Sequence, residues 1–141
     1  WNAWQGFYKE LESRVDIDSW GYVANPSGGF LGAWWHFIDE KDCTMYLQLE
    51  QGKLCFKISY EGEGDRSEVR FREHIKLMKL AQGRFPEIRR PDRFGTGTYM
   101  TIAVVDEESL FGNGPVNFDN LTTKLKEYET LVDNCCTSNV G

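Results

Sequence analysis

The stretch that decides the fold is residues 44–60, which read Thr-Met-Tyr-Leu-Gln-Leu-Glu-Gln-Gly-Lys-Leu-Cys-Phe-Lys-Ile-Ser-Tyr. Apolar and polar residues alternate on both sides of Gln51-Gly52, which is typical of a tight antiparallel hairpin. With these two residues in the turn, a slip of one residue would expose six apolar side chains, so the register is well specified. The expected pairs are Leu49–Leu54, Leu47–Phe56 and Met45–Ile58 on the apolar face, and Glu50–Lys53, Gln48–Cys55 and Tyr46–Lys57 on the other face.

The segments around this hairpin supply further strands and helices. Runs of apolar and β-branched residues between turn signals predict strands, and apolar residues at helical spacing predict helices. The expected strands are 18–25, 30–38 and 99–105, with a short edge strand at 85–90. The expected helices are 2–15, 67–81 and 118–132.

Two of these elements have a predicted orientation. The 30–38 strand is apolar on both sides, one of which is formed by Leu31, Ala33, Trp35 and Phe37. The 67–81 helix has an apolar stripe of Phe71, Ile75 and Met78, and Arg70, Arg72, Lys76 and Lys79 supply much of its polar surface. The sequence therefore predicts a single α+β domain over residues 1–141, with an antiparallel sheet of about five strands and helices mainly on one face. The expected order is N-terminal helix, β-meander, helix, strand and C-terminal helix.

Composition excludes several classes of protein. With 141 residues, 40% hydrophobic and 27% charged, the chain has the composition of one globular domain. No apolar run approaches the roughly 20 residues of a membrane-spanning helix, and no signal peptide is evident. We therefore expect no membrane partner. The four cysteines form no CxxC pair and both histidines are isolated, so we expect reduced thiols, no metal site and a cytoplasmic location. Because the chain opens without an initiator Met, we expect a C-terminal fragment of a longer protein.

Charge is distributed unevenly along the chain. The net charge of −6 argues against a general nucleic-acid binder, yet residues 66–93 hold nine basic and four acidic residues. Arginine and lysine contacts to phosphate supply most non-specific affinity for nucleic acids, so this segment is a candidate DNA- or RNA-contacting surface. The alternative is a solvated helix face with surface arginines. The candidate residues are Arg89, Arg90, Arg93, Lys76, Lys79 and Arg72.

Three other motifs have both a functional and a structural interpretation. Gly95-Thr96-Gly97 invites comparison with nucleotide-binding loops, but it lacks their lysine and spacing and precedes a strand, which favours a plain connection. Trp34-Trp35-His36 would form a platform for stacking bases if exposed, whereas aromatic residues on a two-sided strand typically belong to the core. Cys135-Cys136 at a helix end is not a recognisable nucleophile site.

Two stretches carry a resemblance to a known family: Tyr46-Leu-Gln-Leu-Glu-Gln-Gly-Lys-Leu-Cys-Phe-Lys-Ile58 and Arg90-Pro-Asp-Arg-Phe-Gly-Thr-Gly-Thr-Tyr-Met-Thr-Ile-Ala103. They resemble the C-terminal region of bacterial proteins in the PD-(D/E)XK nuclease superfamily, and the likeness extends over most of the chain. In that family the metal-binding carboxylates and lysine lie in an N-terminal domain. The resemblance therefore implies Mg²⁺ only for an upstream nuclease domain, and no cofactor in this chain.

The chain does not supply the catalytic set of that family. Pro91-Asp92 is followed by no acid-x-Lys strand, and Cys55 occupies the position before Lys57 that needs a carboxylate. Without two carboxylates on Mg²⁺, metal-assisted phosphodiester hydrolysis has no means of activating water. The resemblance thus implies association with a nuclease rather than cleavage by this chain, and whether the parent protein is an active nuclease stays open.

Three hypotheses of function result. The leading one is a non-catalytic C-terminal accessory domain of a PD-(D/E)XK nuclease-like protein, which adjoins an upstream domain and contacts DNA or RNA through the basic residues. The second is a protein-interaction or dimerisation module, a homodimer included, that uses exposed aromatic residues and a free sheet edge. The third is an enzyme in its own right, which predicts a pocket with converging polar groups.

Overall fold

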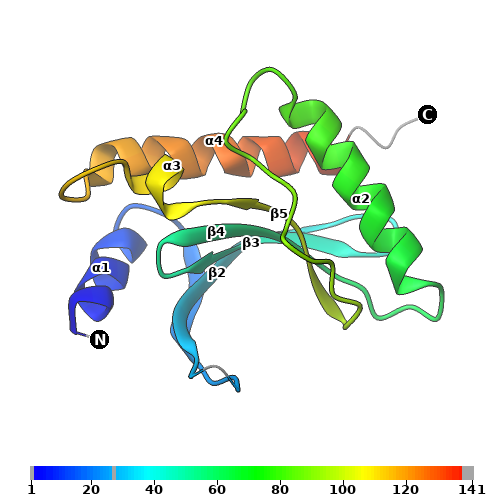
Figure 1. Ribbon diagram of the computed structural model, residues 1–141, viewed down its shortest axis with the longest axis horizontal. Coiled ribbons are helices and arrows are strands. Elements are labelled where there is room, and N and C mark those ends of the chain that lie inside the picture. The colour runs from blue at the N-terminus through cyan, green and yellow to red at the C-terminus, as the bar shows by residue number, and fades with distance from the viewer. Residues whose placement is uncertain (1, 27, 138–141) are drawn as a thin grey trace.

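The computed structural model describes residues 2–26 and 28–137, which form one antiparallel sheet with helices around it (Figure 1). The order of the strands in the sheet is β1-β2-β3-β4-β5. The strands are β1 (Ile17–Val23), β2 (Phe30–Asp39), β3 (Thr44–Glu50), β4 (Lys53–Ser59) and β5 (Tyr99–Val105). The helices are α1 (Asn2–Glu12), α2 (Arg66–Ala81), α3 (Glu107–Phe111) and α4 (Phe118–Thr137). The predicted α+β class, the antiparallel meander and the terminal helices are confirmed.

The β3–β4 hairpin has the predicted register, and every expected pair forms. Gln51 turns the chain with a φ of 54°, in the left-handed region that few residues other than glycine adopt. The hydroxyl of Tyr8 in α1 supports this turn. It donates to the carbonyl of Leu31 at 2.7 Å and accepts from the Gln51 N–H at 2.9 Å. Helix α1 thereby ties the hairpin to β2.

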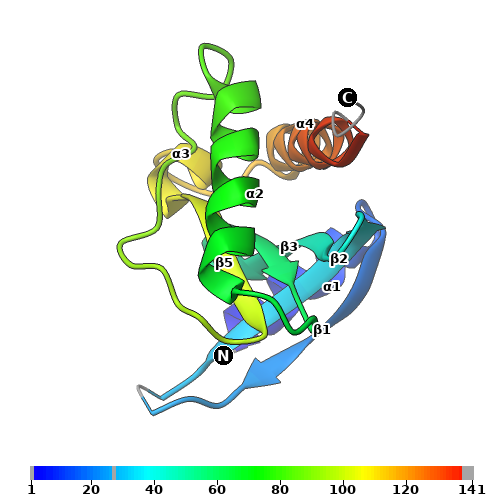
Figure 2. The same cartoon turned by 90° about the vertical axis from the view of Figure 1, so that its right-hand side faces the viewer.

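The helices pack on one face of the sheet. Helices α2, α3 and α4 lie on the same side of the strands (Figures 1 and 2), and α1 contacts β1 and β2. One core cluster joins α1 and α4 to the sheet, with Tyr8, Leu47, Phe56 and Leu125 among its members. In the part of the chain that the structure describes, no helix combines the length and apolar character needed to cross a lipid bilayer.

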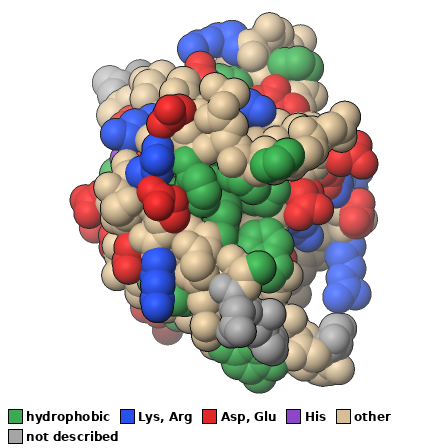
Figure 3. Space-filling model, turned by 90° about the vertical axis from the view of Figure 1, so that its left-hand side faces the viewer, with side chains coloured by type: hydrophobic (Ala, Val, Ile, Leu, Met, Phe, Trp, Pro, Cys, Tyr) green, Lys and Arg blue, Asp and Glu red, His purple; other side chains and the backbone are tan. Residues whose placement is uncertain are grey.

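At the α1 end of the molecule, this core reaches the surface. The Phe7 ring contacts the rings of Trp4, Phe111 and Phe118 at centroid distances of 5.3 to 5.5 Å. Figure 3 shows hydrophobic side chains gathered in the middle of this end of the molecule, with charged side chains around them. These rings close the core between α1, α3 and α4.

Several boundaries differ from the predicted ones. Helix α1 ends three residues earlier than expected, and α4 extends five residues further. The short α3 lies between the predicted strand 99–105 and the predicted helix 118–132, where no element was expected. The edge strand expected at 85–90 is reduced to a bridge between Arg89 and Val104. Pro86 and Pro91 flank this bridge, and proline has no N–H to donate to a sheet ladder.

A bulge in β2 changes which side chains share a face. The pairing of β2 with β3 shifts between Trp35 and Ile38, and His36 has a φ of 61°. Because the alternation restarts after a bulge, Phe37 leaves the face on which it was predicted. It stacks instead on Tyr46, with ring centroids 4.8 Å apart.

Helix α2 buries a different face from the predicted one. Phe71 and Ile75 of the expected apolar stripe are 45% and 60% exposed, whereas Arg70 and Glu73 are buried. Arg70 Nη1 donates to the carbonyl of Gly95 at 2.7 Å, and Glu73 is paired with cations of its own helix. These polar contacts compensate the burial of charge, and helical periodicity alone does not reveal them.

Candidate nucleic-acid interface

The three candidate basic residues on α2 differ in their partners. Arg72 Nη1 donates to Asp42 Oδ2 at 3.0 Å, and Lys76 Nζ lies 2.6 Å from Glu40 Oε1. Lys79 is exposed and, among the described residues, has no carboxylate within 4.0 Å. Arg72 and Lys76 thus form ion pairs within the chain, and of the three only Lys79 is available to a ligand.

The loop after α2 also contains paired and unpaired arginines. Arg89 Nε lies 2.7 Å from Asp106 Oδ2, and its Nη1 lies 3.1 Å from Asp92 Oδ1. Arg90 places its guanidinium over the Phe94 ring, and Arg93 is exposed. Neither Arg90 nor Arg93 has an ion pair with a residue in the described ranges. The structure therefore divides the six candidates into three paired and three unpaired cations.

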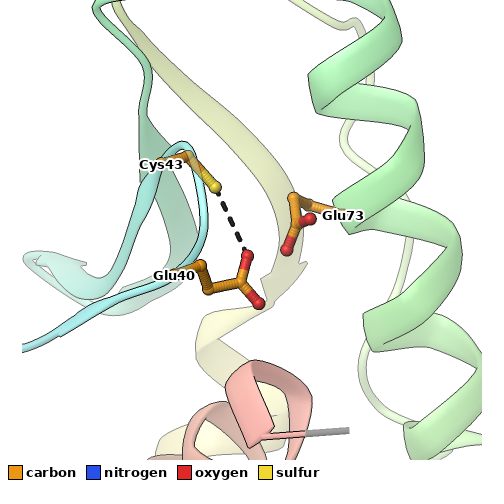
Figure 4. A group of neighbouring side chains, drawn as sticks. All are labelled: Glu40, Cys43 and Glu73. Carbon is orange, nitrogen blue, oxygen red and sulfur yellow. Dashed lines mark hydrogen bonds between the residues drawn. The ribbon is translucent and has the colours of Figure 1, made fainter. Parts of the chain in front are cut away.

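The α2 ion pairs belong to a buried carboxylate group between α2 and the β2–β3 turn (Figure 4). The side chains of Glu40 and Glu73 are 1% and 0% exposed, and the Cys43 thiol donates to Glu40 at 3.3 Å. Burial and the hydrogen bond with Glu40 raise the pKa of Glu73 to about 7. Burial also acts to raise the pKa of Glu40, but hydrogen bonds from Glu73 and Lys76 hold it below its usual value. Near neutral pH Glu73 is therefore only partly ionised, whereas Glu40 carries its negative charge.

Three side chains of this group have atoms that bind metals. One ligand atom each from Glu40, Cys43 and Glu73 lies within 4.8 Å of the others. However, the Lys76 ammonium lies 2.6 Å from Glu40 and 3.2 Å from Glu73, where it neutralises the carboxylates. Burial also raises the pKa of the Cys43 thiol, which binds a metal only as the thiolate. The group fits a buried ion-pair network that fastens α2 to the sheet better than it fits a metal centre.

The sheet face opposite the helices, which we call the open face, carries aromatic side chains. Phe37 and Tyr99 are 46% and 65% exposed on it. The strand register places Tyr46 beside Lys57 and Lys57 beside Thr101, in a row across β3, β4 and β5. A hollow of about 320 Å³ lies on the same face and includes Tyr46 of this row. It is lined by Trp34, Phe37, Tyr46, Gln48, Ser59 and Tyr99.

Hydrogen bonds hold the polar groups of the open face in place. Gln48 Oε1 accepts from the Trp34 indole N–H at 2.7 Å, and Gln48 Nε2 donates to Glu50 at 2.7 Å. Lys57 Nζ donates to Thr101 Oγ1 at 3.1 Å and has no carboxylate within 4.0 Å in the described part of the chain. Burial lowers the pKa of Lys57. An ammonium group held without a counter-ion attracts an anionic ligand.

A basic hollow adjoins the open face at the edge formed by β5. It has a volume of about 250 Å³, and Thr101, the partner of Lys57, belongs to its lining. Arg89 reaches this place because its backbone pairs with Val104 of β5. The lining residues are Lys53, Arg89, Pro91, Asp92, Arg93, Thr101 and Val104.

The core role favoured for Trp34-Trp35-His36 over a stacking platform holds for Trp35 but not for Trp34. Trp34 lines the open-face hollow, but Trp35 is buried in the core and His36 Nε2 lies 2.7 Å from Asp133 of α4. The prediction missed Phe37, because strict alternation ignores the bulge. The predicted hairpin register places Tyr46 and Lys57 together on its second face. That pairing is the sequence signal for the open face, although the sequence alone predicts no function for it.

The remaining motifs take structural roles. The carbonyls of Gly95 and Thr96 accept hydrogen bonds from Arg70 and Arg66 at 2.7 and 3.3 Å. This loop therefore turns acceptors, rather than the N–H donors of a phosphate loop, toward its neighbours. Cys135 is buried and its pKa is raised to about 12 by burial, which suits a core thiol and not a nucleophile.

Comparison of the chain with protein-family models, with curated proteins and with solved structures found no match. Function is therefore inferred from the chemistry of the surfaces. The open face brings together the stacked rings of Phe37 and Tyr46 and the ammonium of Lys57, and the basic hollow adjoins it at the β5 edge.

Proposed function

We propose that this chain is a non-catalytic domain that binds single-stranded nucleic acid on its open face. The observation that carries the proposal is the stacked pair Phe37–Tyr46, the exposed ring of Tyr99 and the unpaired Lys57 on one uncovered face. Aromatic rings stack on the unpaired bases of single strands with little regard to sequence, and nearby cations bind the backbone phosphates.

The strand register gives the ligand a path. Along β5, Tyr99 comes first and Thr101 follows with Lys57 beside it. The basic hollow of Lys53 and Arg93 lies beyond Thr101. Lys53 Nζ is 3.9 Å from Glu50, a loose contact that a phosphate can replace. A strand bound in this direction would stack a base at Tyr99 and pass three cations.

Single strands are the better ligand for physical reasons. The bases of a duplex are stacked on one another, so the rings of the open face cannot reach them without unpairing. A duplex would contact only the cations, and the chain as a whole carries a charge of −6, which repels a polyanion. Binding is therefore confined to the open face and depends on the aromatic residues.

The resemblance to the C-terminal region of PD-(D/E)XK nuclease-like proteins supports an accessory role. Lys57 lies on a β-strand, as a nuclease lysine would, but Cys55 stands where the carboxylate is needed and is 1% exposed. We propose that the domain holds a nucleic-acid strand for an upstream domain of the same protein.

Fluorescence anisotropy with a labelled oligothymidine of about 15 nucleotides, and with a duplex of the same length, tests the proposal. Three phosphate contacts predict a slope of about −2 for log affinity against log salt. Tyr99→Ala should weaken single-strand binding roughly 5- to 150-fold, since stacking contributes about 1–3 kcal/mol per base. Phe71→Ala removes an aromatic residue exposed on α2 and serves as the matched control. Absence of binding at low salt, or equal duplex affinity with Tyr99→Ala unchanged, refutes the proposal.

A further inference from the structure

The solvent-facing side of α2 carries an apolar surface. Phe71 and Ile75 lie one helical turn apart and are 45% and 60% exposed. Ile75 also lines a groove of about 540 Å³ beside the C-terminal half of α2. Exposed apolar side chains beside a groove are typical of an interaction site.

The second wall of this groove is the chain segment that returns from α2. Gly83 reverses the chain with a φ of 80°, and the Phe85 N–H donates to the carbonyl of Ala81 at 2.9 Å. Phe85 and Ile88 are buried, so the returning segment is anchored in the core. The groove is therefore preformed. Its apolar lining includes Ile75, Met78, Phe85, Pro86 and Ile88.

The rim of the groove is positively charged. Lys79 lines it, and the Arg84 guanidinium lies 5.2 Å from the centroid of the Phe85 ring. Neither Lys79 nor Arg84 has an ion pair with another described residue. The neighbouring Glu87 accepts a hydrogen bond from the Tyr128 hydroxyl at 2.7 Å. Two cations on a chain of net charge −6 make this rim a place where an acidic partner is favoured over the rest of the surface.

We infer that this groove docks a protein partner through an amphipathic helix whose apolar side chains enter the groove and whose flanking carboxylates meet Lys79 and Arg84. The volume accommodates a few aliphatic side chains, as helix-in-groove recognition requires. The walls are largely aliphatic, which disfavours stacked bases and distinguishes the groove from the open face. This inference is independent of nucleic-acid binding.

Two synthetic peptides test the inference against the whole chain. One has leucine at positions i, i+3, i+4 and i+7 and glutamate on its polar face, and the other has lysine in place of each glutamate. Titration calorimetry should show binding of the glutamate peptide and at least roughly tenfold weaker binding of the lysine peptide. Amide shifts in NMR spectra should map to residues 75–88.

Variants locate the contact. Ile75→Asp and Lys79→Glu should each lower the affinity for the glutamate peptide by about tenfold or more. The first removes an apolar contact in the groove, and the second removes a cation that meets the glutamates. Both residues are exposed, so both variants should fold, which circular dichroism verifies. Lys41→Glu reverses an exposed cation elsewhere and should leave binding unchanged.

Four results would overturn the inference: failure of the glutamate peptide to bind, equal binding of both peptides, amide shifts outside residues 75–88, or insensitivity to Ile75→Asp. Light scattering that shows a dimer abolished by Ile75→Asp would assign the groove to a second copy instead. Sedimentation with vesicles of anionic lipid, lost in Lys79→Glu, would assign it to a membrane surface.

Discussion

The buried pair Glu40–Glu73 makes a sharp prediction about pH. The pKa of Glu73 is raised from 4.5 to about 7 in the folded chain. Between these values the unfolded chain releases the proton while the folded chain keeps it, so the folded state binds more protons and loses stability as pH rises. A shift of this size corresponds to a loss of about 2–3 kcal/mol between pH 5 and pH 8. The contribution of Glu40 to stability depends on pH in the opposite direction. Because its pKa is lowered in the folded chain, this contribution is lost only as the pH falls below about 4.5.

Glu73→Gln isolates this effect. The amide keeps the size of the side chain and donates a hydrogen bond, as the protonated carboxyl does, but it does not ionise. The variant should therefore match the wild type near pH 5 and exceed its stability by about 2–3 kcal/mol near pH 8. Its free energy of unfolding should be nearly flat between these values.

Urea unfolding followed by tryptophan fluorescence at several pH values from about 5 to 8 measures the difference. Glu68→Gln, an exposed substitution on the same helix, is the matched control and should keep the wild-type slope. The reasoning fails if the wild type is flat over this range, or if Glu73→Gln retains the wild-type dependence on pH. Carboxyl carbon shifts in NMR spectra would report the pKa of Glu73 directly.

Two further predictions concern the sheet. Tyr8→Phe removes a hydroxyl that bonds the carbonyl of Leu31 and the N–H of Gln51, and urea unfolding should show a loss of about 1–3 kcal/mol; a loss well under that range would contradict the role assigned to this hydroxyl. Lys57→Met removes a half-buried cation that has no carboxylate partner among the described residues, so it should raise the free energy of unfolding by about 1 kcal/mol. The same substitution should make the salt slope of oligonucleotide binding shallower by about 0.7. If stability and binding both stay unchanged, Lys57 is not part of the interface.

The hairpin register was predictable because it depends on neighbours in the sequence. Alternation over residues 44–60 and a glycine-containing turn leave one arrangement that buries Leu47 and Phe56 together. The order of the strands and the terminal helices followed from the same local signals. By contrast, no local signal marks the bulge at His36, whose ring contacts Asp133 of α4, 97 residues away in sequence. Strict alternation therefore assigned Phe37 to the wrong face.

For the candidate site, the sequence predicts which residue types are present but not which of them pair with one another. The surplus of basic residues in 66–93 is visible in the sequence, but their partners are not. Arg72 meets Asp42 across 30 residues, and Arg89 meets Asp106 across 17 residues. Such pairs form only when the chain has folded. Sequence composition alone therefore does not separate Arg72 and Arg89 from Arg90 and Arg93, which form no ion pair with a described residue.

The orientation of α2 connects its buried network with its exposed groove. Glu73 lies in line with Val69 and Leu77, whereas Phe71 and Ile75 lie on the opposite side of the helix. An orientation that buried Phe71 and Ile75 would gain about 1.5–3 kcal/mol for each side chain. It would also withdraw Glu73 from Glu40, Arg72 and Lys76 and break the link to the β2–β3 turn. The ion pairs of Glu73, together with the burial of Val69 and Leu77, thus hold this face of α2 against the core. Phe71 and Ile75 are left in solvent, where Ile75 lines the groove that we propose as the docking site of a partner.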